Sequence, residues 1–182
     1  GDVNGDGYDD FWVSSLNEEN PFNPGNVVLV FGTEEMPSRV ELREPRARGM
    51  RIEGIYPNSM IWDSVHSTGD LNGDGYPDIF AVNHHAPAKV YFNDGSGGFN
   101  DSGQELTLAA FNPSTVVLGD INSDGAPDAF IIHGGLPNTL WINDGEGFFT
   151  KSETSYGGNS SSYMDLVDLD GDGMLEMILC ED

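Results

Sequence analysis

Four acidic segments with the same pattern constrain this chain more than any other feature. Each has oxygen-bearing side chains at its first, third, fifth and ninth positions, an apolar residue at the second and a glycine at the sixth. They span residues 2–10, 70–78, 120–128 and 168–176, so that successive starts lie 68, 50 and 48 residues apart. A motif that returns at such intervals predicts a repeat architecture.

The pattern predicts loops that wrap around a hard cation. Ca²⁺ takes six to eight oxygen ligands in flexible geometry, whereas Mg²⁺ keeps water and a stricter octahedron. The sixth-position glycine permits the positive-φ turn that folds the loop. We therefore predict up to four Ca²⁺ ions, one for each loop. The predicted ligands, with the seventh residue of each loop offering its backbone carbonyl, are Asp2, Asn4, Asp6, Tyr8, Asp10, Asp70, Asn72, Asp74, Tyr76, Asp78, Asp120, Asn122, Asp124, Ala126, Asp128, Asp168, Asp170, Asp172, Met174 and Glu176.

Plain turns and EF-hands are the alternative interpretations of this motif. Asn-Asp-Gly segments make hairpin turns, the role that we assign to residues 93–95 and 143–145, but a turn does not explain four oxygen positions repeated four times. An EF-hand loop enters a helix and carries an acidic ligand at position 12. This chain has apolar residues there and then short runs rich in β-branched and aromatic residues, which predict buried strands.

The second and third units align beyond the loop, because residues 90–99 match residues 140–149 at an offset of 50. Each unit predicts a strand into the loop, a strand out of it, a third strand, a hairpin and a fourth strand. Four antiparallel strands per repeat are the content of a β-propeller blade. We predict an all-β chain with repeats at about residues 1–59, 60–112, 113–160 and a truncated 161–182, and one short helical turn at residues 107–111.

These features resemble the FG-GAP/VCBS repeats of integrin-α-type β-propellers. Phe31-Gly32 is similar to the Phe-Gly of the family name, and the hairpins after Tyr91 and Trp141 are similar to the VCBS form; the Gly-Ala-Pro element is absent. The resemblance implies calcium held between the first two strands of each blade. It also implies a fragment, about three blades plus partial ends forming an open arc, with the rest of the propeller expected in a longer parent chain.

The charge of the chain excludes several classes of partner. Among 182 residues, 31 Asp and Glu oppose 7 Lys and Arg, for a formal charge of −24. Such acidity argues against binding nucleic acid or anionic lipid, and no apolar run reaches the roughly 18 residues of a membrane-spanning helix. A single cysteine, Cys180, cannot form an internal disulfide, and we expect it to face the core.

The remaining side chains predict no catalytic site. Without a nucleophile pattern, we expect His66, His84, His85 and His133 to be ordinary surface histidines. Five arginines between residues 39 and 51 predict a solvated loop. The aromatic residues of the strand-like runs predict packing between blades rather than a sugar-stacking platform; they are Trp12, Trp62, Trp141, Tyr91 and Phe92.

Three functions are compatible with these features. The first is a non-enzymatic, calcium-stabilised propeller segment that is extracellular, at a cell surface or periplasmic, and presents loops to a protein or carbohydrate ligand as adhesion proteins do. The second is a piece of a secreted polysaccharide lyase or phospholipase-like enzyme, since similar repeats occur in both. An intracellular calcium sensor is disfavoured, because no helix pair that could open is predicted. No set of general acids and bases stands apart from the metal ligands, so we expect a binding module and no enzyme.

Overall fold

The computed structural model describes residues 1–15, 26–35, 49–53, 65–83, 86–106, 113–157 and 161–181. Within these ranges the chain forms thirteen β-strands and no helix, which confirms the predicted all-β class. No helix in these ranges therefore has the length and apolar character needed to cross a membrane. The predicted helical turn at 107–111, the histidines at 84 and 85, Trp62 and the arginines at 39, 43, 46 and 48 lie outside the described residues.

The strands form four antiparallel sheets, and in each sheet the strands are neighbours in chain order. The first sheet contains β1 (Phe11–Ser15), β2 (Asn26–Val30) and β3 (Gly49–Glu53). The second contains β4 (Val65–Gly69), β5 (Asp78–Asn83), β6 (Ala86–Asn93) and β7 (Phe99–Asp101). The third contains β8 (Pro113–Gly119), β9 (Asp128–His133), β10 (Asn138–Asn143) and β11 (Phe149–Tyr156), and the fourth contains β12 (Ser161–Val167) and β13 (Glu176–Glu181).

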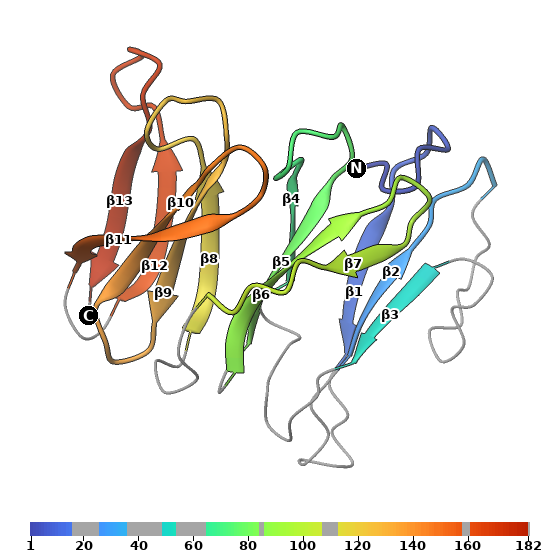
Figure 1. The fold of residues 1–182 in the computed structure, drawn as a ribbon, viewed down its shortest axis with the longest axis horizontal. Coiled ribbons are helices and arrows are strands. Elements are labelled where there is room, and N and C mark those ends of the chain that lie inside the picture. Colours follow the sequence, from blue (N-terminus) through green and yellow to red (C-terminus); the bar gives the residue numbers. More distant parts are fainter. Residues whose placement is uncertain are drawn as a thin grey trace.

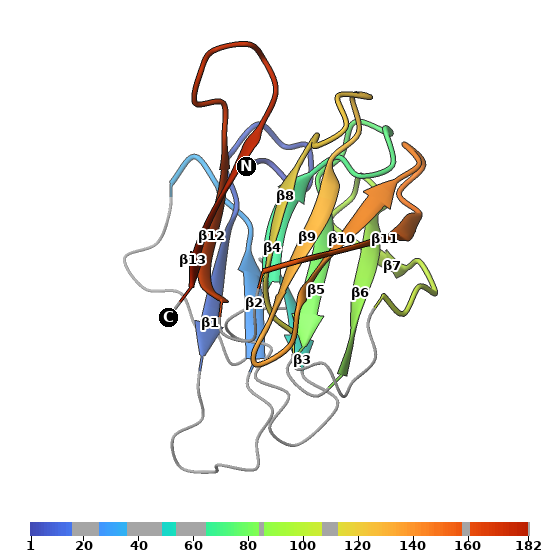
Figure 2. The ribbon, with the colours of Figure 1, turned by 90° about the vertical axis from the view of Figure 1, so that its left-hand side faces the viewer.

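The sheets stand in a row that follows the sequence, like consecutive blades of a propeller that does not close (Figure 1). Two sheets have the predicted four-strand order, with the acidic loop between their first two strands. The turned view shows the sheets stacked behind one another (Figure 2). The loop between β12 and β13 extends further than the other loops in this view.

Apolar side chains hold neighbouring sheets together. One core cluster joins the second and third sheets, where the rings of Phe80 and Phe149 meet edge-on with centroids 5.3 Å apart. A second cluster joins the third sheet to Met164 of β12. Trp12 of β1 lies 6.4 Å from Phe99 of β7, between ring centroids, and links the first two sheets. The predicted packing of aromatic residues between blades is thus confirmed for Trp12, and also for Phe92 and Trp141, which pack against the first cluster.

Strand β9 is buried along its whole length because sheets cover both of its faces. Ala129 and Ile131 belong to the cluster on one face, while Phe130 and Ile132 belong to the cluster on the other. This explains why residues 129–132 are continuously apolar rather than alternating, as is typical of a strand covered on both sides.

The prediction of a surface location was wrong for His133. This last residue of β9 is 1 % exposed, and its Nε2 lies 3.0 Å from the Thr139 hydroxyl oxygen. Its backbone N–H donates to Asn138 Oδ1 at 3.1 Å. Because β9 is a central strand, even its polar end is covered, and a buried imidazole requires such partners.

Candidate metal centres

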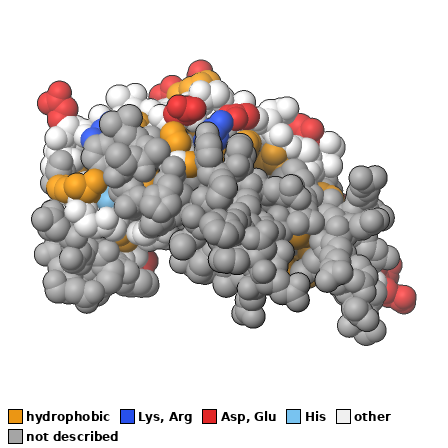
Figure 3. All heavy atoms as spheres, turned by 90° about the horizontal axis from the view of Figure 1, so that it is seen from below, with side chains coloured by type: hydrophobic (Ala, Val, Ile, Leu, Met, Phe, Trp, Pro, Cys, Tyr) orange, Lys and Arg blue, Asp and Glu red, His pale blue; other side chains and the backbone are white. Residues whose placement is uncertain are grey.

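The four acidic loops lie along one side of the row, at the same end of each sheet (upper side in Figure 1). Three of them connect the first two strands of a sheet: β4 to β5, β8 to β9, and β12 to β13; the first loop leads directly into β1. In the view from the opposite side, the described acidic side chains lie in several separate places around the outline (Figure 3). Strand topology therefore places all twenty predicted ligand residues on one side of the row of sheets.

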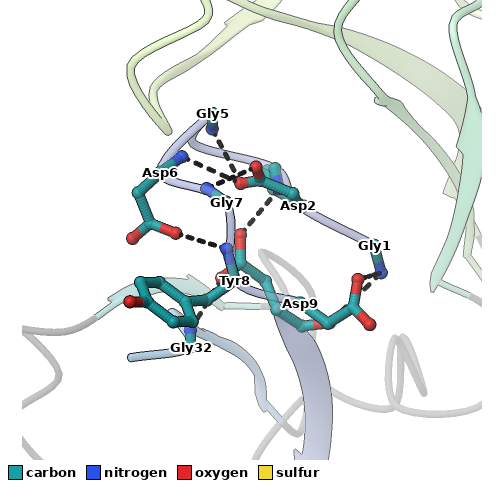
Figure 4. Close-up of polar contacts among 10 residues, drawn as sticks. Gly1, Asp2, Gly5, Asp6, Gly7, Tyr8, Asp9 and Gly32 are labelled. Atoms are coloured by element: carbon teal, nitrogen blue, oxygen red, sulfur yellow. Dashed lines mark hydrogen bonds and ion pairs between the residues drawn. The ribbon is translucent and has the colours of Figure 1, made fainter. Parts of the chain in front are cut away.

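The first carboxylate of each loop accepts hydrogen bonds from backbone N–H groups of that loop, as Figure 4 shows for Asp2 in the first loop. Asp2 Oδ1 accepts from the N–H of Gly5 at 2.8 Å and of Asp6 at 3.1 Å, and its Oδ2 accepts from Gly7 at 2.8 Å. Such charge-assisted bonds stabilise the ionised carboxylate. Asp70 and Asp120 each accept two of these bonds, from the fifth and sixth residues of their loops, and Asp168 accepts two, from the fourth and sixth.

The third and fifth side chains of the first three loops contact each other. Asn4 accepts from the Asp6 N–H at 3.0 Å and donates from Nδ2 to the Asp6 carboxylate at 3.0 Å. The other Asp6 oxygen accepts from the Tyr8 N–H at 2.9 Å. The structure thus brings together the third and fifth predicted ligands, and the corresponding pairs are Asn72 with Asp74 and Asn122 with Asp124.

Two residues in each loop, at the fourth and sixth positions, have a positive φ that folds the backbone. The sixth-position glycines have φ between 89° and 93°, which confirms the predicted positive-φ turn; they are Gly7, Gly75, Gly125 and Gly173. The fourth position is also left-handed, and there the third loop carries Ser123, with φ 60°, where the others carry glycine. Ser123 is the one positive-φ residue other than glycine in the described part of the chain.

The ninth-position aspartates of the first three loops are buried, whereas the first and third positions are half-buried or exposed and the fifth is exposed. In the third loop, Asp128 Oδ2 accepts from the Ile121 N–H at 3.2 Å and Oδ1 from the Asn143 N–H at 2.9 Å. Burial raises the pKa of Asp78 and of Asp128, against the lowering effect of these backbone bonds. A nearby divalent cation would offset this burial cost, because it favours the ionised form.

The fourth loop brings three predicted ligands closest together. Ligand atoms of Asp168, Asp170 and Glu176 all lie within 4.8 Å of one another. Asp172 follows the shared pattern, since its N–H donates to Asp170 at 3.1 Å. Three convergent carboxylates on a flexible oxygen-rich loop suit a hard divalent cation, so this cluster could hold a metal ion.

The apolar second residue of each loop predicts a side chain that points into a core. This is confirmed for Val3 and Leu71, which are 2 % and 1 % exposed, and Ile121 packs against the second cluster. It was wrong for Leu169, which is 64 % exposed. The reason is that the last sheet of the row, β12–β13, has a described neighbour on one side only.

The hairpin asparagines were interpreted from the sequence as parts of plain turns, but they also contact the loops. Asn93 is 3 % exposed and Asn143 is 1 % exposed, and each donates from Nδ2 to two backbone carbonyls of the acidic loops. The same place in the first unit is held by Gly32, whose N–H donates to Asp10 at 2.7 Å. In the sequence, the recurrence of Asn93 and Asn143 at an offset of 50 residues indicated a shared role, but it could not show which atoms they contact.

A hollow of about 220 Å³ separates the second and third loops. Asp70, Leu71 and Gly73 line it from one loop, and Asp124 to Pro127 from the next, with Gly145 of the hairpin between them. Adjacent loops are therefore near neighbours rather than isolated sites.

A row of antiparallel sheets, two of them four-stranded in the described residues, with an acidic loop between the first two strands of each four-stranded sheet, defines a β-propeller-type repeat protein. A family model described as FG-GAP-like repeat matches residues 70–131 and 120–179. These matches cover more than half of the chain, which therefore belongs to the FG-GAP-like repeat family, as the resemblance suggested. No curated protein matches the chain. Membership in this family indicates a β-propeller-type interaction module.

Proposed function

We propose that this chain is a calcium-stabilised β-propeller segment that acts outside the cell as a protein- or glycan-interaction module of the adhesion type. The observation that carries the proposal is the loop geometry. One hydrogen-bonded conformation occurs four times, and in the fourth loop the oxygens of three carboxylates lie within 4.8 Å of one another. Ca²⁺ prefers oxygen ligands, and carboxylate oxygens gathered on one loop are ligands of this kind.

Calcium would serve the fold rather than a reaction. The side chains of the first, third, fifth and ninth positions, with the seventh carbonyl, would hold the ion, and the ion supplies positive charge among the clustered carboxylates. Four Ca²⁺ ions would change the formal charge from −24 to −16. Neutralising carboxylates that otherwise repel one another by several kcal/mol at close range stabilises the folded loops.

Two considerations support an extracellular interaction role. Calcium loops of extracellular modules bind with dissociation constants of about 10⁻⁴–10⁻³ M, which suits the calcium level outside cells. The four loops also lie along one side of the row of sheets, so that metal binding would stiffen one continuous side of the molecule for a partner (Figure 1).

Thermal unfolding tests the calcium role directly. When free Ca²⁺ is ten times the dissociation constant, each occupied loop contributes about 1.4 kcal/mol by mass action. We expect the melting temperature to rise with millimolar Ca²⁺ and to fall again in excess chelator. Identical melting curves in Ca²⁺ and in chelator, starting from demetallated protein, would contradict the proposal.

A matched pair of variants ties that effect to the loops. Asp124→Ala removes the fifth-position carboxylate of the third loop, whereas Asp144→Ala removes the exposed hairpin aspartate that the same repeat carries outside the loop. The first variant should lose part of the calcium-induced rise in melting temperature, and the second should retain all of it. Equal calcium responses in the two variants would assign the ion to another site.

Partner binding is tested on arrays of extracellular glycans and proteins. We expect retention on a specific partner in Ca²⁺ that is lost in chelator and restored by added Ca²⁺. Turnover of a polysaccharide or phospholipid by the purified chain would instead favour the enzyme alternative.

A further inference from the structure

Each hairpin asparagine bridges two consecutive acidic loops. Asn143 Nδ2 donates to the Leu71 carbonyl of the second loop at 2.9 Å and to the Pro127 carbonyl of the third loop at 3.1 Å. Asn93 does the same one repeat earlier, with the Val3 carbonyl at 2.7 Å and the Pro77 carbonyl at 3.0 Å. Both hydrogens of the side-chain amide are therefore used, one on each loop.

The same asparagines also hold candidate metal ligands through their backbone. The Asn143 N–H donates to Asp128 Oδ1 at 2.9 Å, and the Asn93 N–H donates to Asp78 Oδ1 at 2.9 Å. Leu71, which receives the bridge, lies between the candidate ligands Asp70 and Asn72. Through Asn143, a continuous path of hydrogen bonds thus joins the candidate ligand at the ninth position of one loop to the second residue of the loop before it.

The oxygen of the Asn143 side-chain amide is held by the hairpin, so the side chain cannot rotate freely. Asn143 Oδ1 accepts from the N–H groups of Gly145 and Gly147, both at 3.1 Å. The side chain is 1 % exposed, so water does not compete for these bonds. In Figure 1 the turn after β10 reaches toward the loop between β4 and β5, which agrees with this contact.

The first unit lacks such a side chain. Gly32 supplies the backbone bond to Asp10, as Asn93 and Asn143 do for their own loops, but it has no amide to donate. A Cβ on Gly32 would collide with the Asp9 carbonyl oxygen, so no side chain fits there. A backbone N–H is therefore enough to hold the ninth-position aspartate. The bridging side-chain amide of the later repeats is not needed for that contact and has another role.

We propose that Asn93 and Asn143 are positioning residues that couple calcium binding in consecutive loops, the first loop to the second and the second to the third. This rests on the proposed calcium function. An ion that fixes Asp128 and the end of its loop also fixes Asn143, and Asn143 then holds the Leu71 peptide between two ligands of the preceding loop. By linkage the coupling acts equally in both directions.

The sign of the effect separates this coupling from simple charge repulsion. Through space, an empty loop is more negative than a filled one and would strengthen calcium binding in its neighbour. Through the bridge, an empty loop leaves Asn143 less fixed and weakens binding in its neighbour. A hydrogen bond contributes about 0.5–1.5 kcal/mol, which corresponds to about a two- to tenfold change in affinity.

The experiment follows each loop separately by NMR during a Ca²⁺ titration of the full chain. The Gly75 and Gly125 amides, which donate to the first carboxylates of the second and third loops, report the two sites. Asp124→Asn disables the third loop. We expect the midpoint at Gly75 to shift to about two- to tenfold higher Ca²⁺. An unchanged or lower midpoint would overturn the coupling.

The bridge itself is tested by Asn143→Ala, with Asn138→Ala as the control. Asn138 is equally buried in the same strand, but it accepts from His133 at the other end of β10. In the Asn143 variant, Asp124→Asn should no longer raise the Gly75 midpoint, whereas in the Asn138 variant the upward shift should persist. A shift that survives in the Asn143 variant would overturn the assignment of the bridge.

A substitute variant and the response of the wild-type chain separate failure of the coupling from failure of calcium binding. If Asn143→Ala does not fold, Asn93→Ala tests the bridge between the first and second loops in the same way, with Gly7 and Gly75 as reporters. If neither glycine amide responds to Ca²⁺ in the wild-type chain, both the calcium function and the coupling fail. If both respond but independently, only the coupling fails.

Discussion

Lys89 and Asp101 form an ion pair between β6 and β7, with Nζ 2.8 Å from Oδ2. The hydrogen bond from Lys89, aided by the Gly103 N–H, lowers the pKa of Asp101, and the same bond raises the pKa of Lys89. The pair therefore stabilises the fold between the two titrations. Its contribution is lost as the pH falls through the lowered pKa of Asp101, or rises through the raised pKa of Lys89.

A double-mutant cycle of Lys89→Met and Asp101→Asn measures this pair. Both side chains are partly exposed, so we expect a coupling energy of about 0.2–1 kcal/mol at pH 7 that declines as the pH falls through the lowered pKa of Asp101. Denaturant unfolding of the four proteins at each pH gives the value. A coupling energy that stays constant down to pH 3 would show that packing, rather than charge, joins the two residues.

At the scale of the elements, aromatic rings of one repeat pack against hairpin glycines of the next. A Cβ on Gly97 would lie 2.6 Å from Phe31 Cζ, and a Cβ on Gly147 would collide with the ring of Phe92. By contrast, a Cβ on Gly145 would meet nothing within 4 Å. Gly145 and Gly147 have nearly equal φ, 85° and 82°, so they form a matched pair for separating backbone strain from packing.

Gly145→Ala should cost about 1–2 kcal/mol, the price of a left-handed conformation for an L-residue. Gly147→Ala should cost an additional ~1–3 kcal/mol, because the methyl group must displace the Phe92 ring. Urea unfolding of both variants in chelator measures the difference without a calcium contribution. Equal costs would mean that the contact between the repeats adapts without penalty.

The strands and loops were predictable from local patterns, whereas the contacts between repeats were not. The apolar run at residues 129–132 predicted a buried strand, and the loop spacing correctly placed the acidic turn before it. Nothing local indicated that Asn143 would contact Leu71, because those residues are 72 positions apart. His133 was misjudged for a related reason: its burial comes from the position of β9 at the centre of a sheet, which periodicity does not reveal.

For the whole molecule, the formal charge of −24 predicts strong salt dependence in the absence of calcium. Raising NaCl from about 0.05 to 0.5 M shortens the range of repulsion to a few ångströms. We expect the melting temperature of the demetallated protein to rise by about 2–4 °C for each kcal/mol of repulsion relieved.

The control for the effect of NaCl on the melting temperature is the same measurement at low pH. Near the isoelectric point, pI ≈ 4.1, net repulsion vanishes, and the same increase in NaCl should leave the melting temperature almost unchanged. A salt effect of equal size at pH 4 and pH 7 would point to general exclusion of salt from the surface instead of charge screening.

The asparagine bridges also set an order of maturation during synthesis. The Val3 carbonyl receives its partner from a residue 90 positions later, and the Leu71 carbonyl from one 72 positions later. A ribosome therefore releases the first and second acidic loops well before the hairpins that bridge to them have been made. Each of these two loops is completed by the repeat that follows it, so during synthesis it waits for its bridge until that repeat has been made.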